Sequence, residues 1–341
     1  MQHLKENTFK VLNGMSIGIV VALLPSAILG NIFNYLFDVP YLEMLLSFST
    51  SLMALLIGVC IAMQFKLDPI STCVLAVTTM VSGGAVRSMI DGTIQVQGSG
   101  DILNAGIGAV LTLLLIHLIG NRLKAYKLII LPCLAIVLVG TITSLTAGPV
   151  STITTFIGTV VDHFTTLQPM LMSILLAISF VLIIISPLSS VAIALLIDLS
   201  GIGSAAANVG ITGAAITLAI LNYRSNGLAT ALAHFLGSPK IQMANFIKAP
   251  IMIVPGLVAG AIASIFVPIF GAVGTPFSAG FGLSGGIGPL GHLGIVGFTP
   301  QTIFIAVLVF ILIPTLSSFA MVFLFRNVLK WVNDEQYKLD I

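Results

Sequence analysis

The chain has 341 residues, of which 57% are hydrophobic and 7% are charged, and its formal net charge is +2. A soluble domain carries about 25% charged residues, so this composition excludes a soluble globular protein. No basic patch suited to nucleic acid stands out. The three cysteines lie in or beside apolar runs without metal-ligand spacing, so we expect neither a metal site nor a cofactor.

Apolar runs long enough to cross a bilayer recur along the chain. A spanning helix needs roughly 20 mostly apolar residues. The runs that approach or pass this length are 9–37, 42–63, 102–119, 128–147, 170–185, 251–270 and 303–325. The pattern predicts an all-α, polytopic helical membrane protein that contacts the lipid bilayer along most of its surface.

Lysine and arginine near span ends indicate the cytoplasmic side. Lys5 and Lys10 place the N-terminus inside the cell, and Arg326 and Lys330 place the C-terminus there too. We therefore expect a multi-pass protein of the cell membrane with both termini cytoplasmic, which requires an even number of spans.

Residues 148–168 separate two halves of different character. This stretch has no lysine or arginine, and its apolar residues share one helical face opposite a threonine-rich face, which is typical of an amphipathic surface helix. The predicted organisation is a five-span scaffold and dimerisation half (1–147), an amphipathic linker helix (148–168), a transport half (169–326) and a cytoplasmic tail (327–341).

The second half is interrupted by proline and glycine. Residues 222–249 and 272–299 are apolar enough to enter the membrane but too broken to cross it as plain helices, and 191–221 is either one interrupted span or two half-helices. Non-helical backbone at membrane depth is tolerated where protein buries it or water reaches it, and transporters build binding sites there. The alternatives are closely packed glycine-rich helices or external loops. We expect eight to ten spans with two re-entrant or broken hairpins.

Several polar side chains in these segments are candidates for solute binding. Arginine offers a planar fork for carboxylate or phosphate, and amides and imidazoles bond hydroxyl groups. Arg224 and its neighbours also fit a cytoplasmic turn, and each histidine also fits a structural role. The candidate solute-binding residues are Arg224, Asn226, His234, Gln242, Asn245 and His292.

Asp198 is the only carboxylate between Asp162 and Asp334. An ionisable residue within the membrane is a functional candidate by default, so Asp198 is the candidate for ion coupling, as a cation ligand, a proton relay or a partner of Arg224. The alternative is an aspartate at a helix end on the membrane surface, since Ser200 and Gly201 follow. No pattern indicates a catalytic residue.

The run GSPKIQMANFIKAP at 237–250 resembles a signature of the phosphotransferase-system EIIC-like type 2 family, some of whose members are labelled perfringolysin O regulator-like (PfoR-like). Three further stretches agree with it: NGMSIG at 13–18, SPLSSVAI at 186–193 and GFGLSGGIG at 280–288. The resemblance covers essentially the whole chain.

This resemblance implies an EIIC-like permease fold and a homodimer, with a first half that makes the dimer contact and a second half that binds sugar. It also implies a separate EIIB protein that phosphorylates the bound sugar. Sugar EIIC proteins carry a glutamate in a hairpin motif, and this chain has no glutamate in its second half before Glu335. Coupled phosphorylation, and with it an enzymatic activity, is therefore the less favoured reading.

Three functions fit these observations. The first is a homodimeric permease for a small polar solute, a sugar or sugar-like molecule, in which the second half moves as an elevator. The second is an EIIC subunit that works with a separate EIIB in sugar phosphotransfer. The third is a membrane regulator that senses a solute without transporting it.

Overall fold

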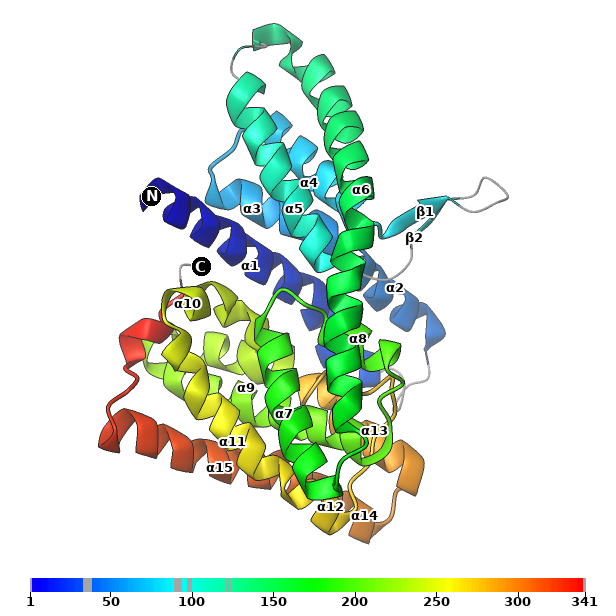
Figure 1. Cartoon of the computed structure of the whole chain (residues 1–341), viewed down its shortest axis with the longest axis vertical. Helices are drawn as coiled ribbons and strands as arrows, with labels where there is room; N and C mark the ends of the chain where they lie inside the picture. The colour runs from blue at the N-terminus through cyan, green and yellow to red at the C-terminus, as the bar shows by residue number, and fades with distance from the viewer. Residues whose placement is uncertain are drawn as a thin grey trace. The chain divides into compact units, whose positions relative to one another are not determined.

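The structure is a computed structural model that describes residues 2–32, 39–88, 94–96, 100–120, 122 and 124–339. The regular secondary structure of the described residues is helical apart from one short β-hairpin, and the chain divides into two compact units (Figure 1). Unit 1 contains Met1–Ser26 and Asp38–Ile153, and unit 2 contains Ala27–Phe37 and Thr154–Ile341. The predicted all-α polytopic fold is confirmed. The end of the first predicted span, 33–37, lies outside the described residues.

Unit 1 is built from helices that pack through small residues. A β-carbon on Gly14 or Gly18 would lie 2.6 Å from the Cα atom of Ile61 or Ile57, so the first and third helices can approach only with glycine there. The elements are α1 (Gln2–Ile32) up to Ser26, α2 (Pro40–Ser51), α3 (Met53–Gln64), α4 (Pro69–Gly83), the antiparallel strands β1 (Val86–Ser88) and β2 (Ile94–Val96), α5 (Ile102–Leu115) and the start of α6 (Lys127–Phe164).

One ion pair ties the start of α4 to the start of α6. Asp68 caps α4 by accepting from the backbone N–H and the hydroxyl of Ser71. It also accepts from the Lys127 ammonium group at 2.5 Å. The hydrogen bond from Lys127 lowers the pKa of Asp68 to about 2, so this carboxylate stays ionised at neutral pH.

Unit 2 holds the remaining helices and both broken segments. Helical turns of 3₁₀ type cover Pro239–Gln242, Pro250–Ile253, Ser284–Gly286 and Asp334–Tyr337. The α-helices are the end of α6, α7 (Pro169–Ile185), α8 (Ser190–Leu196), α9 (Gly201–Leu232), α10 (Met243–Lys248), α11 (Val254–Ser264), α12 (Phe266–Phe270), α13 (Ile287–Val296), α14 (Pro300–Val307) and α15 (Ile313–Val322).

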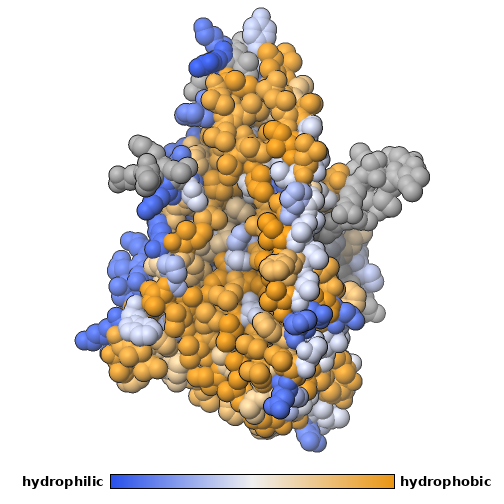
Figure 2. All heavy atoms as spheres, in the orientation of Figure 1, coloured by the Kyte–Doolittle hydropathy of each residue, from blue (hydrophilic) through white to orange (hydrophobic). Residues whose placement is uncertain are grey.

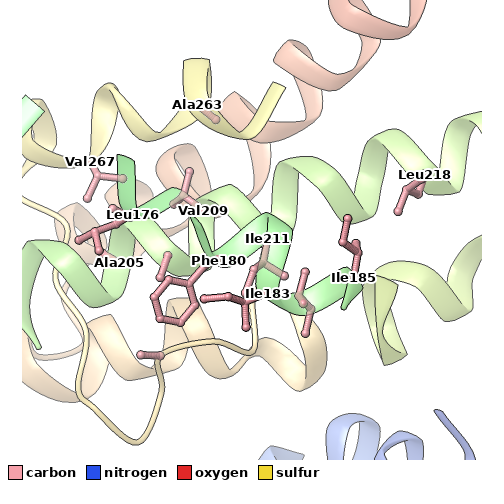
Figure 3. Close-up of a cluster of buried hydrophobic side chains, with 14 of the residues drawn as sticks. Leu176, Phe180, Ile183, Ile185, Ala205, Val209, Ile211, Leu218, Ala263 and Val267 are labelled. Carbon is pink, nitrogen blue, oxygen red and sulfur yellow. The ribbon is translucent and has the colours of Figure 1, made fainter. Parts of the chain in front are cut away.

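Helix α9 is the centre of unit 2, where it packs against α7, α11 and α15 (Figure 1). Small residues allow this: a β-carbon on Gly210 would lie 2.6 Å from the Cα atom of Ala177, and one on Gly213 would lie 2.9 Å from that of Gly260. Larger side chains from α7, including Phe180, fill the space around Val209 of α9 (Figure 3). The close packing of helices that are distant in the sequence supports the two broken segments.

Five described helices are long and apolar enough to cross a membrane, or six if the bent pair α2 and α3 forms one span, and α4 and α7 are shorter apolar helices. Hydrophobic side chains dominate the visible surface (Figure 2). Exposed large apolar residues are what a lipid-facing surface requires, because lipid replaces water as the solvent. The chain is thus a multi-pass membrane protein, while the number of eight to ten spans and the orientation of the termini stay predictions.

Both broken segments are interrupted as the glycines and prolines predict. In the first broken segment (222–249), α9 breaks at Gly227, whose φ of 82° lies in the left-handed region. After the break the chain continues through a π-helical turn and a 3₁₀ turn into α10. In the second broken segment (272–299), a non-helical stretch precedes the turn Ser284–Gly286 and α13. The predicted interruption of 191–221 lies between α8 and α9.

Candidate functional site

The Asn208 side chain of α9 makes three hydrogen bonds to the non-helical part of the second broken segment. Asn208 is fully buried, and its amide nitrogen donates to the carbonyl oxygen of Ser278 at 3.0 Å. Its amide oxygen accepts from the backbone N–H groups of Phe281 at 3.2 Å and Gly282 at 2.9 Å. Unpaired backbone groups are costly away from water. Asn208 therefore stabilises this irregular backbone by pairing its N–H and C=O groups.

Hydroxyl groups complete the support of this segment. Ser190 donates to the carbonyl oxygen of Gly280 at 2.8 Å, and Ser204 donates to that of Thr275 at 2.9 Å. Ser284 donates to the carbonyl oxygen of Gly237 at 2.5 Å. This last bond joins the second broken segment to the first, so the two segments meet inside unit 2.

Lys240 anchors the first broken segment to the end of α7. Its ammonium group is buried and donates to the carbonyl oxygens of Ser186 and Leu188, both at 2.6 Å. Ser186 is the C-terminal cap of α7, where the helix dipole favours a cation. Carbonyl groups at the end of α7 therefore bind the Lys240 ammonium group in the place where a carboxylate would otherwise be expected.

His234 and His292 each present one buried nitrogen atom to the interior without a described partner. The Nδ1–H group of His234 donates to the carbonyl oxygen of Thr230 at 2.8 Å, so its Nε2 atom carries a lone pair. The Nδ1 atom of His292 accepts from the backbone N–H of Val273 at 3.2 Å, so its neutral ring carries the proton on Nε2. Both Nε2 atoms are buried and unpaired among the described residues. One imidazole thus offers an acceptor and the other a donor.

Asn222, Asn226, Gln242 and Asn245 form an amide cluster that binds the end of the chain. The side-chain nitrogens of Asn222, Asn226 and Gln242 converge on the carbonyl oxygen of Tyr337 at 3.2, 2.9 and 3.0 Å. Asn245 donates to Gln242 and to the carbonyl oxygen of Lys338, both at 2.8 Å. The structure therefore brings three predicted residues, Asn226, Gln242 and Asn245, together around a peptide segment.

The two predicted charged residues, unlike these groups, are exposed. The Arg224 side chain is 67% exposed, and its guanidinium lies 4.0 Å from a carboxylate oxygen of Asp334. Asp198 is exposed on the turn between α8 and α9, with a φ of 49°. The structure gives Asp198 no ion pair among the described residues, and the predicted pairing of Asp198 with Arg224 is not observed. Ion coupling through Asp198 stays a prediction.

The sequence reasoning missed the residues that support the site. Asn208 carried a usable signal, because it is the one amide in the first half of α9, where the other residues are mostly small or apolar, and such groups within a membrane are rare. Ser190 and Ser204 carried none, since serine is common in transmembrane helices and bonds its own backbone there. The role of Tyr337 depends on contacts between residues about a hundred positions apart.

A family model described as "Phosphotransferase system, EIIC" matches residues 9–339, which is nearly the whole chain. This match confirms the family indicated by the run at 237–250, and it leaves the perfringolysin O regulator-like label as a prediction. Searches among curated proteins and among solved structures find no significant match. Family members are membrane-embedded subunits that work with other phosphotransferase-system components on a sugar substrate.

Proposed function

Because the chain belongs to the phosphotransferase-system EIIC family of membrane sugar-transport components, we propose that it is a homodimeric permease for a sugar or sugar-like polyol. The observation that carries this proposal is the pair of buried imidazoles, one in each broken segment, with complementary unpaired Nε2 atoms. A hydroxyl group both donates and accepts hydrogen bonds, so a polyol can satisfy the His234 acceptor and the His292 donor.

Burial is what makes these atoms useful for recognition. The exposed fraction is 0% for His234 and 2% for His292, and an unpaired polar atom in such a place costs about 1–3 kcal/mol. A hydroxyl-bearing solute relieves that cost, whereas an apolar molecule of the same size does not. The site accordingly selects by hydrogen bonding and needs no charge on the solute.

The proposed transport step is an elevator-like movement of unit 2. Both broken segments and all the predicted solute-binding residues lie in this one compact unit, joined to each other through Ser284 and Gly237. A carrier that moves with its site intact needs this internal cohesion. The homodimer, in which the first half provides a stationary scaffold, is part of the same proposal.

Family membership favours one alternative, in which the chain is the EIIC subunit of a phosphotransferase system with a separate EIIB protein. In that case the solute leaves the site as a phosphate ester. The sequence has no glutamate or aspartate from 199 to 333, so a carboxylate from the broken segments does not take part in that transfer. The permease without coupled phosphorylation is therefore the function we put first.

Uptake by protein reconstituted in liposomes distinguishes these functions. A panel of radiolabelled hexoses, N-acetylhexosamines and hexitols is tested with and without a cytosolic extract that contains a phosphoryl donor. We expect one class to enter faster than into empty liposomes and to be recovered unmodified. Recovery only as a phosphate ester, and only with extract, favours the EIIC–EIIB alternative. Binding without entry contradicts transport and identifies a sensor.

A further inference from the structure

The last described residues of the chain, 333–339, here called the tail segment, are bound across the first broken segment. This segment has two legs that meet at the break of Gly227. Asn222, Ser225 and Asn226 lie on the leg before the break, and Gln242 and Asn245 lie on the leg after it. The red end of the chain lies beside α9 and α10 in Figure 1.

Hydrogen bonds connect the tail segment to both legs at once. From the first leg, Ser225 donates to the carbonyl oxygen of Asp334 at 2.6 Å, and the Asn226 amide oxygen accepts from the backbone N–H of Leu339 at 2.9 Å. From the second leg, Gln242 and Asn245 donate to the carbonyl oxygens of Tyr337 and Lys338. Separating the legs requires these bonds to break.

Tyr337 anchors the tail segment among these bonds. Its side chain is fully buried, and its hydroxyl group donates to the carbonyl oxygen of Met252 at 2.9 Å. Burial, followed by the charge of Asp334, raises the pKa of Tyr337, which keeps the hydroxyl protonated as a donor. Asp334 itself lies 2.6 Å from the guanidinium of Arg326. The tail segment is therefore held at both ends by specific contacts.

The tail segment combines two buried residues, Tyr337 and Leu339, with exposed ones. Asn333, Glu335 and Lys338 are exposed, and the only regular structure is the 3₁₀ turn Asp334–Tyr337. The bonds from the amide cluster go to main-chain carbonyl groups of the tail segment, and water can supply the same bonds to these amides once Tyr337 has left its buried position. Release of the tail segment therefore requires the Tyr337 side chain to leave the core of unit 2 and the buried bonds to its carbonyl group to break.

We propose that residues 333–339 are a reversible latch that holds the two legs of the first broken segment together. Gly227 is the hinge that the latch controls: its φ of 82° suits glycine, and a β-carbon there would meet nothing within 4 Å. Release of the tail segment exposes the amide cluster and lets the leg that carries His234 move relative to the rest of α9. The proposal is independent of which solute the chain transports.

Distance measurements between spin labels on the two legs test the latch. Tyr223 and Ile247 lie on opposite legs, are 55% and 57% exposed, and are replaced with cysteine after Cys60, Cys73 and Cys133 have been changed to alanine. The full chain should give one narrow distance distribution. Deletion of 333–341 should add a second population at a different distance. The same single distribution in the truncated chain overturns the proposal.

A control variant and a second measurement complete this test. Lys338→Ala is the matched control, because that exposed side chain makes no described bond to the amide cluster and only its carbonyl group does; this variant should match the full chain. If the truncated chain does not fold, hydrogen exchange of the intact chain decides. The Leu339 amide should exchange well before the amides of α9, and exchange of both only through global unfolding overturns the latch.

Discussion

Replacing Asn208 with alanine should lower the free energy of unfolding by about 4 kcal/mol, because two buried and one partly buried backbone group lose their only described partner and each costs about 1–3 kcal/mol. The groups are the carbonyl of Ser278 and the N–H groups of Phe281 and Gly282. Thermal unfolding in detergent measures the effect. Uptake should also be lost, since the stretch that leads into α13 and His292 is no longer held in place.

Thr212→Val is the matched control for this variant. Thr212 lies one turn further along α9, is also fully buried, and donates only to the carbonyl oxygen of Asn208 in its own helix. That carbonyl keeps its place in the helix, so we expect a change below about 1 kcal/mol. If Asn208→Ala is as mild as Thr212→Val, the second broken segment does not depend on this amide.

Replacing Gly260 with alanine should destabilise unit 2 by about 2–3 kcal/mol, the upper part of the range for overpacking. The new β-carbon would lie 2.6 Å from the carbonyl oxygen of Gly210 and 3.0 Å from its Cα atom. These are main-chain atoms of α9 that cannot rotate away, so α9 and α11 must separate. The apparent melting temperature and the fraction of monodisperse protein in detergent should both fall.

Gly294→Ala is the matched control, and it should raise the free energy of unfolding where Gly260→Ala lowers it. A β-carbon on Gly294, inside α13, meets nothing within 4 Å, and alanine is favoured over glycine in a helix by about 0.5–1 kcal/mol. The two variants make the same chemical change, so only the surroundings differ. Equal effects from both would show that α9 and α11 do not pack at the observed separation.

Local patterns predicted much of the fold because the bilayer imposes simple rules on a sequence. The long apolar runs form helices, although 42–63 is divided between α2 and α3, and the prolines and glycines of 222–249 and 272–299 marked both broken segments. The histidines of these segments were found by asking which polar groups lipid would reject. The family followed from the run at 237–250, in which Lys240, Gln242 and Asn245 turn out to make long-range hydrogen bonds.

The partners of these residues could not be predicted, because they are set by packing across long stretches of chain. Gln242 and Asn245 looked like groups for a solute, and in the structure they bind the carbonyl groups of Tyr337 and Lys338. The tail was expected only as a polar cytoplasmic segment, and a buried tyrosine in it gave no periodic signal. For Asp198 and Arg224 the sequence left a surface position open as the alternative to a functional one, and both side chains are exposed in the structure.

The most direct test of the central claim is uptake by variants in which each imidazole becomes asparagine. Asparagine places its amide where Nδ1 was, so the bonds of His234 to Thr230 and of His292 to Val273 can persist while Nε2 is removed. With the sugar that the liposome panel identifies, each variant should reduce uptake about tenfold, the worth of one hydrogen bond. His163→Asn, at an exposed position of α6, should leave uptake unchanged. Equal uptake by all three variants would contradict the claim that these imidazoles bind the solute.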